Sequence, residues 1–128
     1  MLIIVEDESE TASELAEFLS NENFETRIFN DSRSFESSFC DLIENTEALI
    51  IDLRMPFKSG FDLIKTVREQ SPKIPIIILT GHGTEKDMVR ALDLGANSVL
   101  LKPVELNILM ETLRMLITET GHINVENL

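Results

Sequence analysis

The sequence has no tryptophan, no tyrosine and only one cysteine, Cys40, among its 128 residues. A single cysteine excludes a disulfide within the chain and fits a reducing compartment. No apolar run approaches the roughly 18 residues that a membrane-spanning helix requires. Met1 leads directly into the first apolar run, which leaves no room for a secretory signal peptide. We therefore expect a cytoplasmic protein without a membrane segment.

Basic residues are also scarce, with 11 Lys and Arg against 23 Asp and Glu, so the net charge is −12. Such an acidic chain repels phosphate backbones, and we expect no direct nucleic-acid binding by this domain. The remaining composition, 43% hydrophobic and 27% charged, is that of a globular protein. Its length suits one domain with a hydrophobic core of its own.

Five apolar runs rich in Ile, Val and Leu alternate with helical patterns. The predicted strands are Leu2–Val5, Phe24–Phe29, Ala48–Ile51, Ile74–Leu79 and Ser98–Leu101. Three of these runs are continuous, which is typical of strands buried on both faces. The alternation predicts a three-layer, doubly wound α/β fold, with a parallel five-stranded sheet and helices on both of its faces.

Apolar residues three or four positions apart mark the buried faces of five helices. These faces are Ala12, Leu15 and Leu19; Phe35, Phe39 and Leu42; Leu63 or Ile64 with Val67; Met88, Ala91 and Leu92; and Leu106, Leu109, Met110, Leu113, Leu116 and Ile117. Ser59 and Thr84 begin stretches shaped like capping boxes with Asp in place of Glu, while Gly95 and Gly121 stand where C-caps are expected. Cys40 is predicted to be a small buried residue on the second helix.

Polar residues follow four of the five predicted strands. Glu6 and Asp7 follow the first strand, Asp52 the third, Thr80 the fourth and Lys102 the fifth. Singly, all but Asp52 have an ordinary structural explanation, whereas a carboxylate at the edge of an apolar core is costly unless it is paired or coordinated. Because functional groups gather beyond the carboxyl ends of parallel strands, we expect these side chains to meet at one edge.

Three converging carboxylates repel one another and raise one another's pKa unless a cation lies between them. Hard oxygen ligands without a His or Cys cluster indicate Mg²⁺ rather than zinc, with Mn²⁺ as a substitute. Mg²⁺ favours sites where a phosphate oxygen completes its shell, and Lys102 and Thr80 suit an anion. The sequence therefore predicts a phosphoryl site with Asp52 as the candidate nucleophile.

Four motifs, "IIVEDE", "IIDLRMP", "IIILTGHG" and "GANSVLLKP", resemble in residues and spacing the receiver domain of two-component response regulators. The resemblance covers about Leu2 to Glu119. It implies a flavodoxin-like (βα)5 fold with strand order 2-1-3-4-5. We accordingly predict a receiver domain in residues 1–120 and a C-terminal tail or the start of a linker in 121–128.

The resemblance also implies roles at the metal site. Asp52 would accept a phosphoryl group from the phosphohistidine of a sensor histidine kinase or a phosphotransfer protein, in a Mg²⁺-dependent reaction. Asp7 would bind the ion directly and Glu6 mainly through water. The main-chain carbonyl of Arg54 would be a further ligand.

Signalling would follow from the other motif residues. Lys102 would pair with the phosphoryl oxygens, Thr80 would move in to hydrogen-bond one of them, and the Lys102–Pro103 bond would be cis. The surface of the fourth helix, fifth strand and fifth helix would then switch toward a downstream output domain or protein, or toward a second copy of the chain. The domain would thus be a signalling module rather than an enzyme.

The sequence departs from the family pattern three residues before the site lysine, where Val99 replaces the usual Tyr or Phe. We therefore predict activation without a ring rotamer change. Arg54 and His82 each lie two residues beyond a site residue, and either side chain faces solvent or modulates the site. For Arg54, one hypothesis is that it leans over the phosphoryl group and slows attack by water. Gly81 is small and leaves the approach open.

Other functions fit the residues less well. A phosphorylation-independent pseudo-receiver, acting as an interaction or dimerisation module, is the main alternative, but all expected reactive residue types are present. An aspartyl-phosphate hydrolase would carry Asp where this chain has Arg54. A flavin carrier would carry a Ser/Thr/Gly-rich loop where it has Glu6, Asp7 and Glu8, and no nucleotide-binding Gly-Lys-Ser/Thr loop is present.

Overall fold

The computed structural model describes residues 1–119 and contains one parallel sheet in the order β2-β1-β3-β4-β5. The strands are β1 (Leu2–Val5), β2 (Thr26–Phe29), β3 (Ala48–Asp52), β4 (Ile76–Thr80) and β5 (Ser98–Leu101). The helices are α1 (Ser9–Asn21), α2 (Ser32–Leu42), the short 3-10 helix η1 (Ile43–Asn45), α3 (Gly60–Gln70), α4 (Glu85–Leu94) and α5 (Leu106–Glu119). The predicted flavodoxin-like, doubly wound α/β fold is confirmed, including its strand order.

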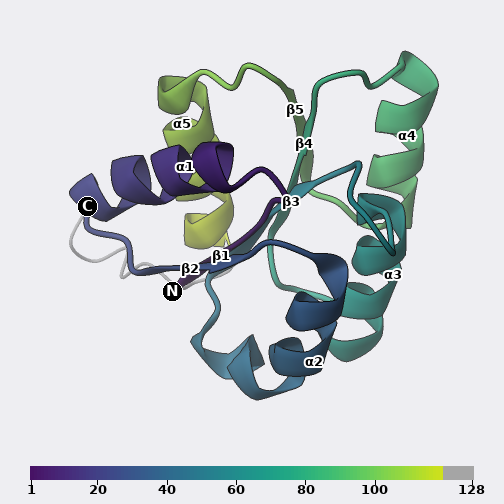
Figure 1. The fold of residues 1–128 in the computed structure, drawn as a ribbon, viewed down its shortest axis with the longest axis horizontal. Helices are drawn as coiled ribbons and strands as arrows, with labels where there is room; N and C mark the ends of the chain where they lie inside the picture. The colour runs from purple at the N-terminus through teal and green to yellow at the C-terminus, as the bar shows by residue number, and fades with distance from the viewer. Residues whose placement is uncertain (120–128) are drawn as a thin grey trace.

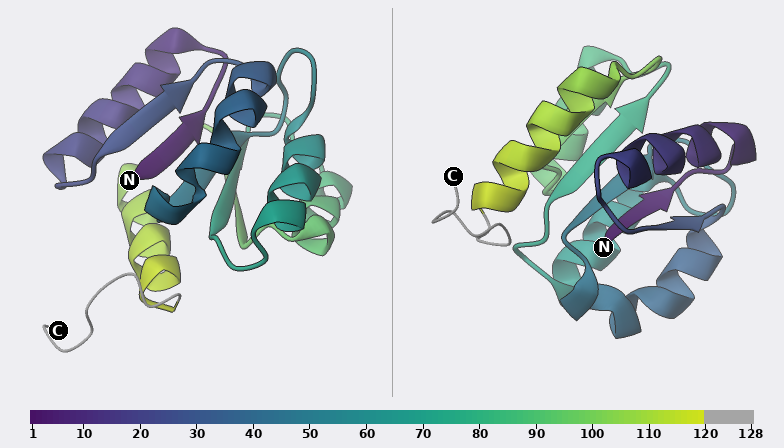
Figure 2. Two further views of the ribbon diagram at one scale, coloured as in Figure 1. Left: turned by 90° about the horizontal axis from the view of Figure 1, so that it is seen from below. Right: turned by 90° about the vertical axis from the view of Figure 1, so that its left-hand side faces the viewer.

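The sheet separates two apolar cores. Helices α1 and α5 cover one face, and α2, α3 and α4 cover the other (Figures 1 and 2). Successive strand residues alternate between the two sides: Ile3 and Val5 pack toward α2–α4, whereas Leu2 and Ile4 pack toward α1 and α5. Both faces of the inner strands are therefore buried, which explains why β1, β3 and β4 are apolar almost without interruption.

The strand register brings the carboxyl ends of the inner strands to the same level. Val5 pairs with Ile51, and Asp52 pairs with Leu79. Glu6, which follows Val5, therefore lies at the level of Asp52 on the neighbouring strand. Thr80 pairs with Leu101 one strand further on, directly before Lys102. The sheet thus gathers at one edge the side chains that the sequence places after separate strands.

Two predicted strands begin later than expected. Phe24 lies before β2 because its N–H donates to the Leu19 carbonyl at 3.0 Å and so helps to end α1. Strand β4 begins at Ile76 because Pro75 has no N–H, although the Pro75 carbonyl accepts a bond of 2.8 Å from the Leu49 N–H. At their other ends β3 and β4 run one residue further than predicted and include Asp52 and Thr80.

Capping residues begin or end helices α3 and α4 as predicted. Ser59 and Thr84 form capping boxes with Asp62 and Asp87. Gly95 ends α4 with a φ of 121°, a backbone conformation that favours glycine. The predicted cap at Gly121 lies outside the described residues.

Three predictions of burial are wrong. Cys40 is exposed because Phe35 and Phe39 form the inward face of α2, and the residue after Phe39 points about 100° away from it. Leu92 and Leu106 are 48% and 38% exposed. Helix α4 buries only Ala91, since it lies over the edge of the sheet formed by β5 and presents a narrow apolar stripe to the core.

Candidate functional site

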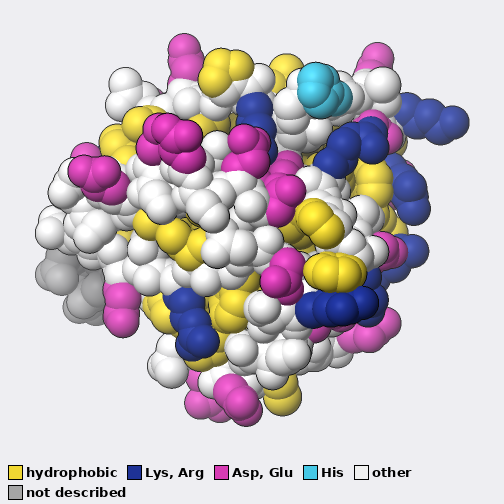
Figure 3. Space-filling view, in the orientation of Figure 1, with side chains coloured by type: hydrophobic (Ala, Val, Ile, Leu, Met, Phe, Trp, Pro, Cys, Tyr) yellow, Lys and Arg dark blue, Asp and Glu magenta, His cyan; other side chains and the backbone are white. Residues whose placement is uncertain are grey.

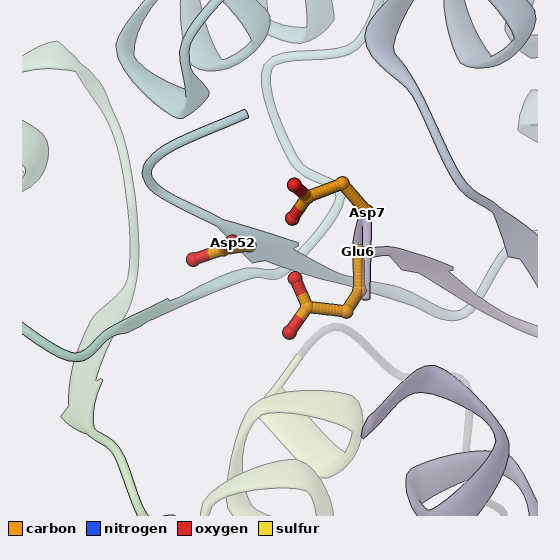
Figure 4. A group of neighbouring side chains, drawn as sticks. All are labelled: Glu6, Asp7 and Asp52. Carbon is orange, nitrogen blue, oxygen red and sulfur yellow. The ribbon is translucent and has the colours of Figure 1, made fainter. Parts of the chain in front are cut away.

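Three carboxylates meet where β1 and β3 end. One oxygen of each of Glu6, Asp7 and Asp52 lies within 4.8 Å of the other two, and Figure 4 shows the three side chains converging. Glu6 and Asp52 are only 1% and 7% exposed, whereas Asp7 is exposed. Acidic side chains lie near the centre of the face shown in Figure 3. The predicted convergence of these carboxylates is thus observed in the structure.

Lys102 joins this cluster from the end of β5. Its Nζ lies 2.7 Å from Glu6 Oε1 and 3.4 Å from Asp52 Oδ1. Its backbone N–H donates to the Thr80 carbonyl at 2.8 Å, which fixes the start of the loop against β4. The following Lys102–Pro103 peptide is cis, as predicted. One ammonium therefore bridges two of the three carboxylates.

Burial and like charge alter the titration of the cluster. Burial first and the neighbouring Asp52 second raise the pKa of Glu6, Lys102 lowers it, and together they place it at about 7. Burial lowers the pKa of Lys102, but its hydrogen bond to Glu6 and the charges of Asp52 and Glu6 outweigh this effect. The pKa of the ammonium consequently lies above its ordinary value. The site as it stands has more negative charge than one lysine balances.

Two buried polar atoms at the site have no hydrogen-bond partner among the described residues, Glu6 Oε2 and Thr80 Oγ1. Thr80 is 1% exposed, and the loop beyond it packs so closely that a Cβ at Gly83 would lie 2.7 Å from Thr80 Cγ2. Leaving buried polar groups unpaired costs stability, so such atoms suit a ligand or group that arrives later. Both atoms are therefore candidates to contact a ligand bound at this edge of the sheet.

The donor set fits a hard divalent cation. Three carboxylates within reach of one point are oxygen ligands of the kind that Mg²⁺ prefers. The buried, unpartnered Oε2 of Glu6 and the excess negative charge would both be relieved by such an ion.

The carboxylates open into a cleft of about 340 Å³. Its lining residues are Asp7, Glu8, Asp52, Arg54, Thr80, Gly81, His82 and Lys102. Gly81 and His82 are exposed at this cleft, and their predicted roles stay predictions. Val99 lies apart from the cleft, half-buried against the α2–α4 core.

Arg54 has a partner that sequence reasoning missed. Its Nη2 lies 3.3 Å from Asp87 Oδ2 on α4. The sequence pattern indicates only the capping role of Asp87 beside Thr84, because the two charged residues are 33 positions apart. No local signal in the sequence connects them.

Comparison with known proteins identifies the family of this chain. The family model of the response regulator receiver domain matches residues 2–114. The chain belongs to this family. Within residues 1–119, moreover, no helix of the receiver domain has the length and apolarity to span a membrane. The predicted boundary between a domain of residues 1–120 and a tail at 121–128 stays a prediction.

Relatives of known sequence are longer than this receiver domain. The transcriptional regulatory protein CpxR of Escherichia coli (strain K12) is 36% identical over 102 residues, which are 80% of this chain and 42% of CpxR. The sensory transduction protein RegX3 of Mycolicibacterium smegmatis is 35% identical over 117 residues, which are 88% of this chain and 48% of RegX3. The chain thus spans about half the length of the curated relatives it matches.

Solved receiver domains share the fold closely. A response regulator receiver domain protein from Clostridium thermocellum superposes with a TM-score of 0.90 at 26% identity, over 94% of this chain and 95% of that one. The beryllofluoride-activated NtrC4 receiver domain dimer superposes with a TM-score of 0.87 at 27% identity, over 93% and 97% of the two chains. Both similarities extend over nearly the whole receiver domain.

Proposed function

We propose that this receiver domain accepts a phosphoryl group on Asp52 from the phosphohistidine of a sensor histidine kinase or a phosphotransfer protein. The observation that carries the proposal is the position of the Asp52 carboxylate. It ends a buried strand, borders an open cleft and lies 3.4 Å from the Lys102 ammonium, beside two further carboxylates. Family membership supports the same assignment.

In the proposed step, an Asp52 carboxylate oxygen attacks phosphorus in line with the phosphorus–nitrogen bond of the donor. An acyl phosphate bond forms as that bond breaks, and the imidazole keeps the bonding electron pair and takes up a proton. The Lys102 ammonium would stabilise the charge on the transferring oxygens. The buried strand β3 would hold the carboxylate in position.

Glu6, Asp7 and Asp52, together with the main-chain carbonyl of Arg54, would hold Mg²⁺, or Mn²⁺ in its place. When bound, the ion supplies positive charge next to the phosphoryl oxygens. Glu6 Oε1 is already paired with Lys102 Nζ at 2.7 Å, which suits an indirect role for Glu6 as a ligand. Asp7 is exposed to the cleft and suits direct ligation.

After transfer, the unpartnered Thr80 hydroxyl would donate to a phosphoryl oxygen and draw its loop inward. The change would reach α4, β5 and α5 and alter their contact with an output domain, a separate protein or a second copy of the chain. Val99 carries no ring, so this switch would work without an aromatic rotamer change. His82 and Gly81 would border the path of attacking water, and Pro103 would set the turn after Lys102. The domain is proposed as a signalling module, not an enzyme with a released product.

The test is phosphorylation by acetyl phosphate with Mg²⁺, followed by mass spectrometry of the intact protein and its peptides. We expect one added phosphoryl group on Asp52 and none in Asp52→Asn. Asp41→Asn, which changes an exposed aspartate on α2, is the matched control and should be labelled like the wild type. No label on the wild type, under conditions that label another receiver domain, would contradict the proposal and favour the pseudo-receiver alternative.

A further inference from the structure

The Arg54 side chain connects the cleft to helix α4. It is 65% exposed, so little packing holds it, and its described ionic partner is Asp87 Oδ2 at 3.3 Å. Arg54 also lines the cleft that contains Asp52. The guanidinium is therefore paired with an anion on α4, and Arg54 borders the cleft that contains the carboxylate phosphorylated in the proposed function.

The Asp87 carboxylate serves the first turn of α4 as well. Its Oδ2 accepts a hydrogen bond of 3.5 Å from the Thr84 N–H, while the Asp87 N–H donates to Thr84 Oγ1 at 3.2 Å. The same oxygen thus contacts both the helix cap and Arg54. A change at Arg54 consequently reaches the start of α4, whose outer surface carries the exposed apolar residues Val89 and Leu92.

A phosphoryl group on Asp52 would compete with Asp87 for this guanidinium. Such a group brings a charge of about −1.5 to −2 and three acceptor oxygens into the cleft. Arginine binds phosphate oxygens through two parallel hydrogen bonds, which is stronger than its single 3.3 Å contact with Asp87. The other lysine or arginine lining the cleft, Lys102, is already paired with Glu6 and Asp52.

We propose that Arg54 is a positioning residue that couples the acceptor site to α4 by exchanging Asp87 for the phosphoryl group. In the unmodified protein the ion pair ties the loop after β3 to the first turn of α4. On phosphorylation the guanidinium moves to the phosphoryl oxygens and Asp87 keeps only its capping contacts. This route requires no aromatic ring, and Val99 provides none. The inference rests on the proposed function, because it requires an anion at Asp52.

A double-mutant cycle tests the exchange, with beryllofluoride and Mg²⁺ as the probe of the acceptor site. Asp87→Asn removes the competing charge and should tighten beryllofluoride binding by about two- to fivefold, the range of an exposed ion pair. Arg54→Gln should weaken binding, and Asp87→Asn should have no effect in the Arg54→Gln background. Asp62→Asn is the matched control, since Asp62 occupies the same capping-box position on α3. It should leave binding unchanged.

Amide chemical shifts give a second measurement. Beryllofluoride should shift the amides of Thr84 to Asp87 in the wild type and much less in Arg54→Gln. The exchange is overturned if Asp87→Asn leaves beryllofluoride affinity unchanged, or if its effect persists without Arg54 and so reflects general charge. Failure of the wild type to bind beryllofluoride and to be phosphorylated would instead overturn the proposed function.

Discussion

Arg68 and Lys102 are partly buried cations at opposite ends of the sheet, and the two are paired in opposite ways. At the amino end, Arg68 donates to the carbonyls of Gly95, Ser71 and Ile74 and to Asn97 Oδ1, at distances of 2.7 to 3.1 Å. At the carboxyl end, Lys102 contacts two carboxylates in a cluster of three. Backbone carbonyls are neutral and do not titrate, so their interaction with Arg68 is independent of pH. Carboxylates, in contrast, bind protons, metals and phosphoryl groups.

The difference separates stability from reactivity within one small domain. The amino end uses a guanidinium to satisfy carbonyls where α3 ends and where β4 and β5 begin. The carboxyl end leaves Glu6 Oε2 and Thr80 Oγ1 buried without partners among the described residues. The Arg68 bonds stabilise the folded chain. The unpartnered atoms at the carboxyl end lower its stability but are available to contact a ligand. Three substitutions can break or sharpen this contrast.

The largest effect is expected at the amino end. Arg68→Ala would leave three backbone carbonyls without their donors and should lower the free energy of unfolding by about 3 to 4 kcal/mol. Urea denaturation measures the loss, and Asp52 should still accept phosphate at a temperature where the variant is folded. Arg114→Ala removes an arginine that is 62% exposed and should change stability by less than about 0.5 kcal/mol. Equal effects of the two substitutions would contradict the structural role of Arg68.

The next effect concerns pH at the carboxyl end. The pKa of Glu6 is about 7 in the folded chain against 4.5 ordinarily, so between these values the folded state binds more protons than the unfolded state. Stability should therefore be highest below pH 4.5 as far as Glu6 contributes, and should fall by up to about 3 kcal/mol as pH rises through 7.

Denaturation with a metal chelator present, from pH 5 to 8, measures this fall. Glu6→Gln should remove this pH dependence. The unfolding free energy of the wild type should therefore fall relative to that of Glu6→Gln as pH rises from 5 to 8. A constant difference across this range would show that Glu6 titrates normally.

Much of the carboxyl end was predictable from sequence, because each site residue follows or ends an apolar run and parallel strands bring those ends together. The positions of Glu6, Asp52 and Lys102 follow from this rule alone. The bonds of Arg68 could not be predicted, since its partners are mostly carbonyls, which every residue has. The Arg54–Asp87 pair could not be predicted for another reason: it joins the loop after β3 to the first turn of α4, and strand periodicity does not fix how a loop approaches a helix.

Helix faces were predicted well in the middle of the molecule and poorly at its edge. The face of α1 that contains Ala12 and Leu19 is buried as expected, whereas Leu92 on α4 is not. Apolar spacing identifies a helix, but the width of its buried stripe depends on how much of the sheet lies beneath it. That quantity is set by strand order.

The smallest effect should reverse the usual sign of a core substitution. Thr80→Val replaces the buried, unpartnered hydroxyl with a methyl group of similar size and should stabilise the protein by about 1 kcal/mol. Thr46 is the matched control: it is equally buried, but its hydroxyl donates to the Leu42 carbonyl at 2.6 Å, so Thr46→Val should destabilise by about 1 kcal/mol. Opposite signs in urea denaturation would show that the two ends of the sheet satisfy their polar groups differently. A loss of stability in both variants would mean that the Thr80 hydroxyl already has a partner and is not held ready for a phosphoryl oxygen.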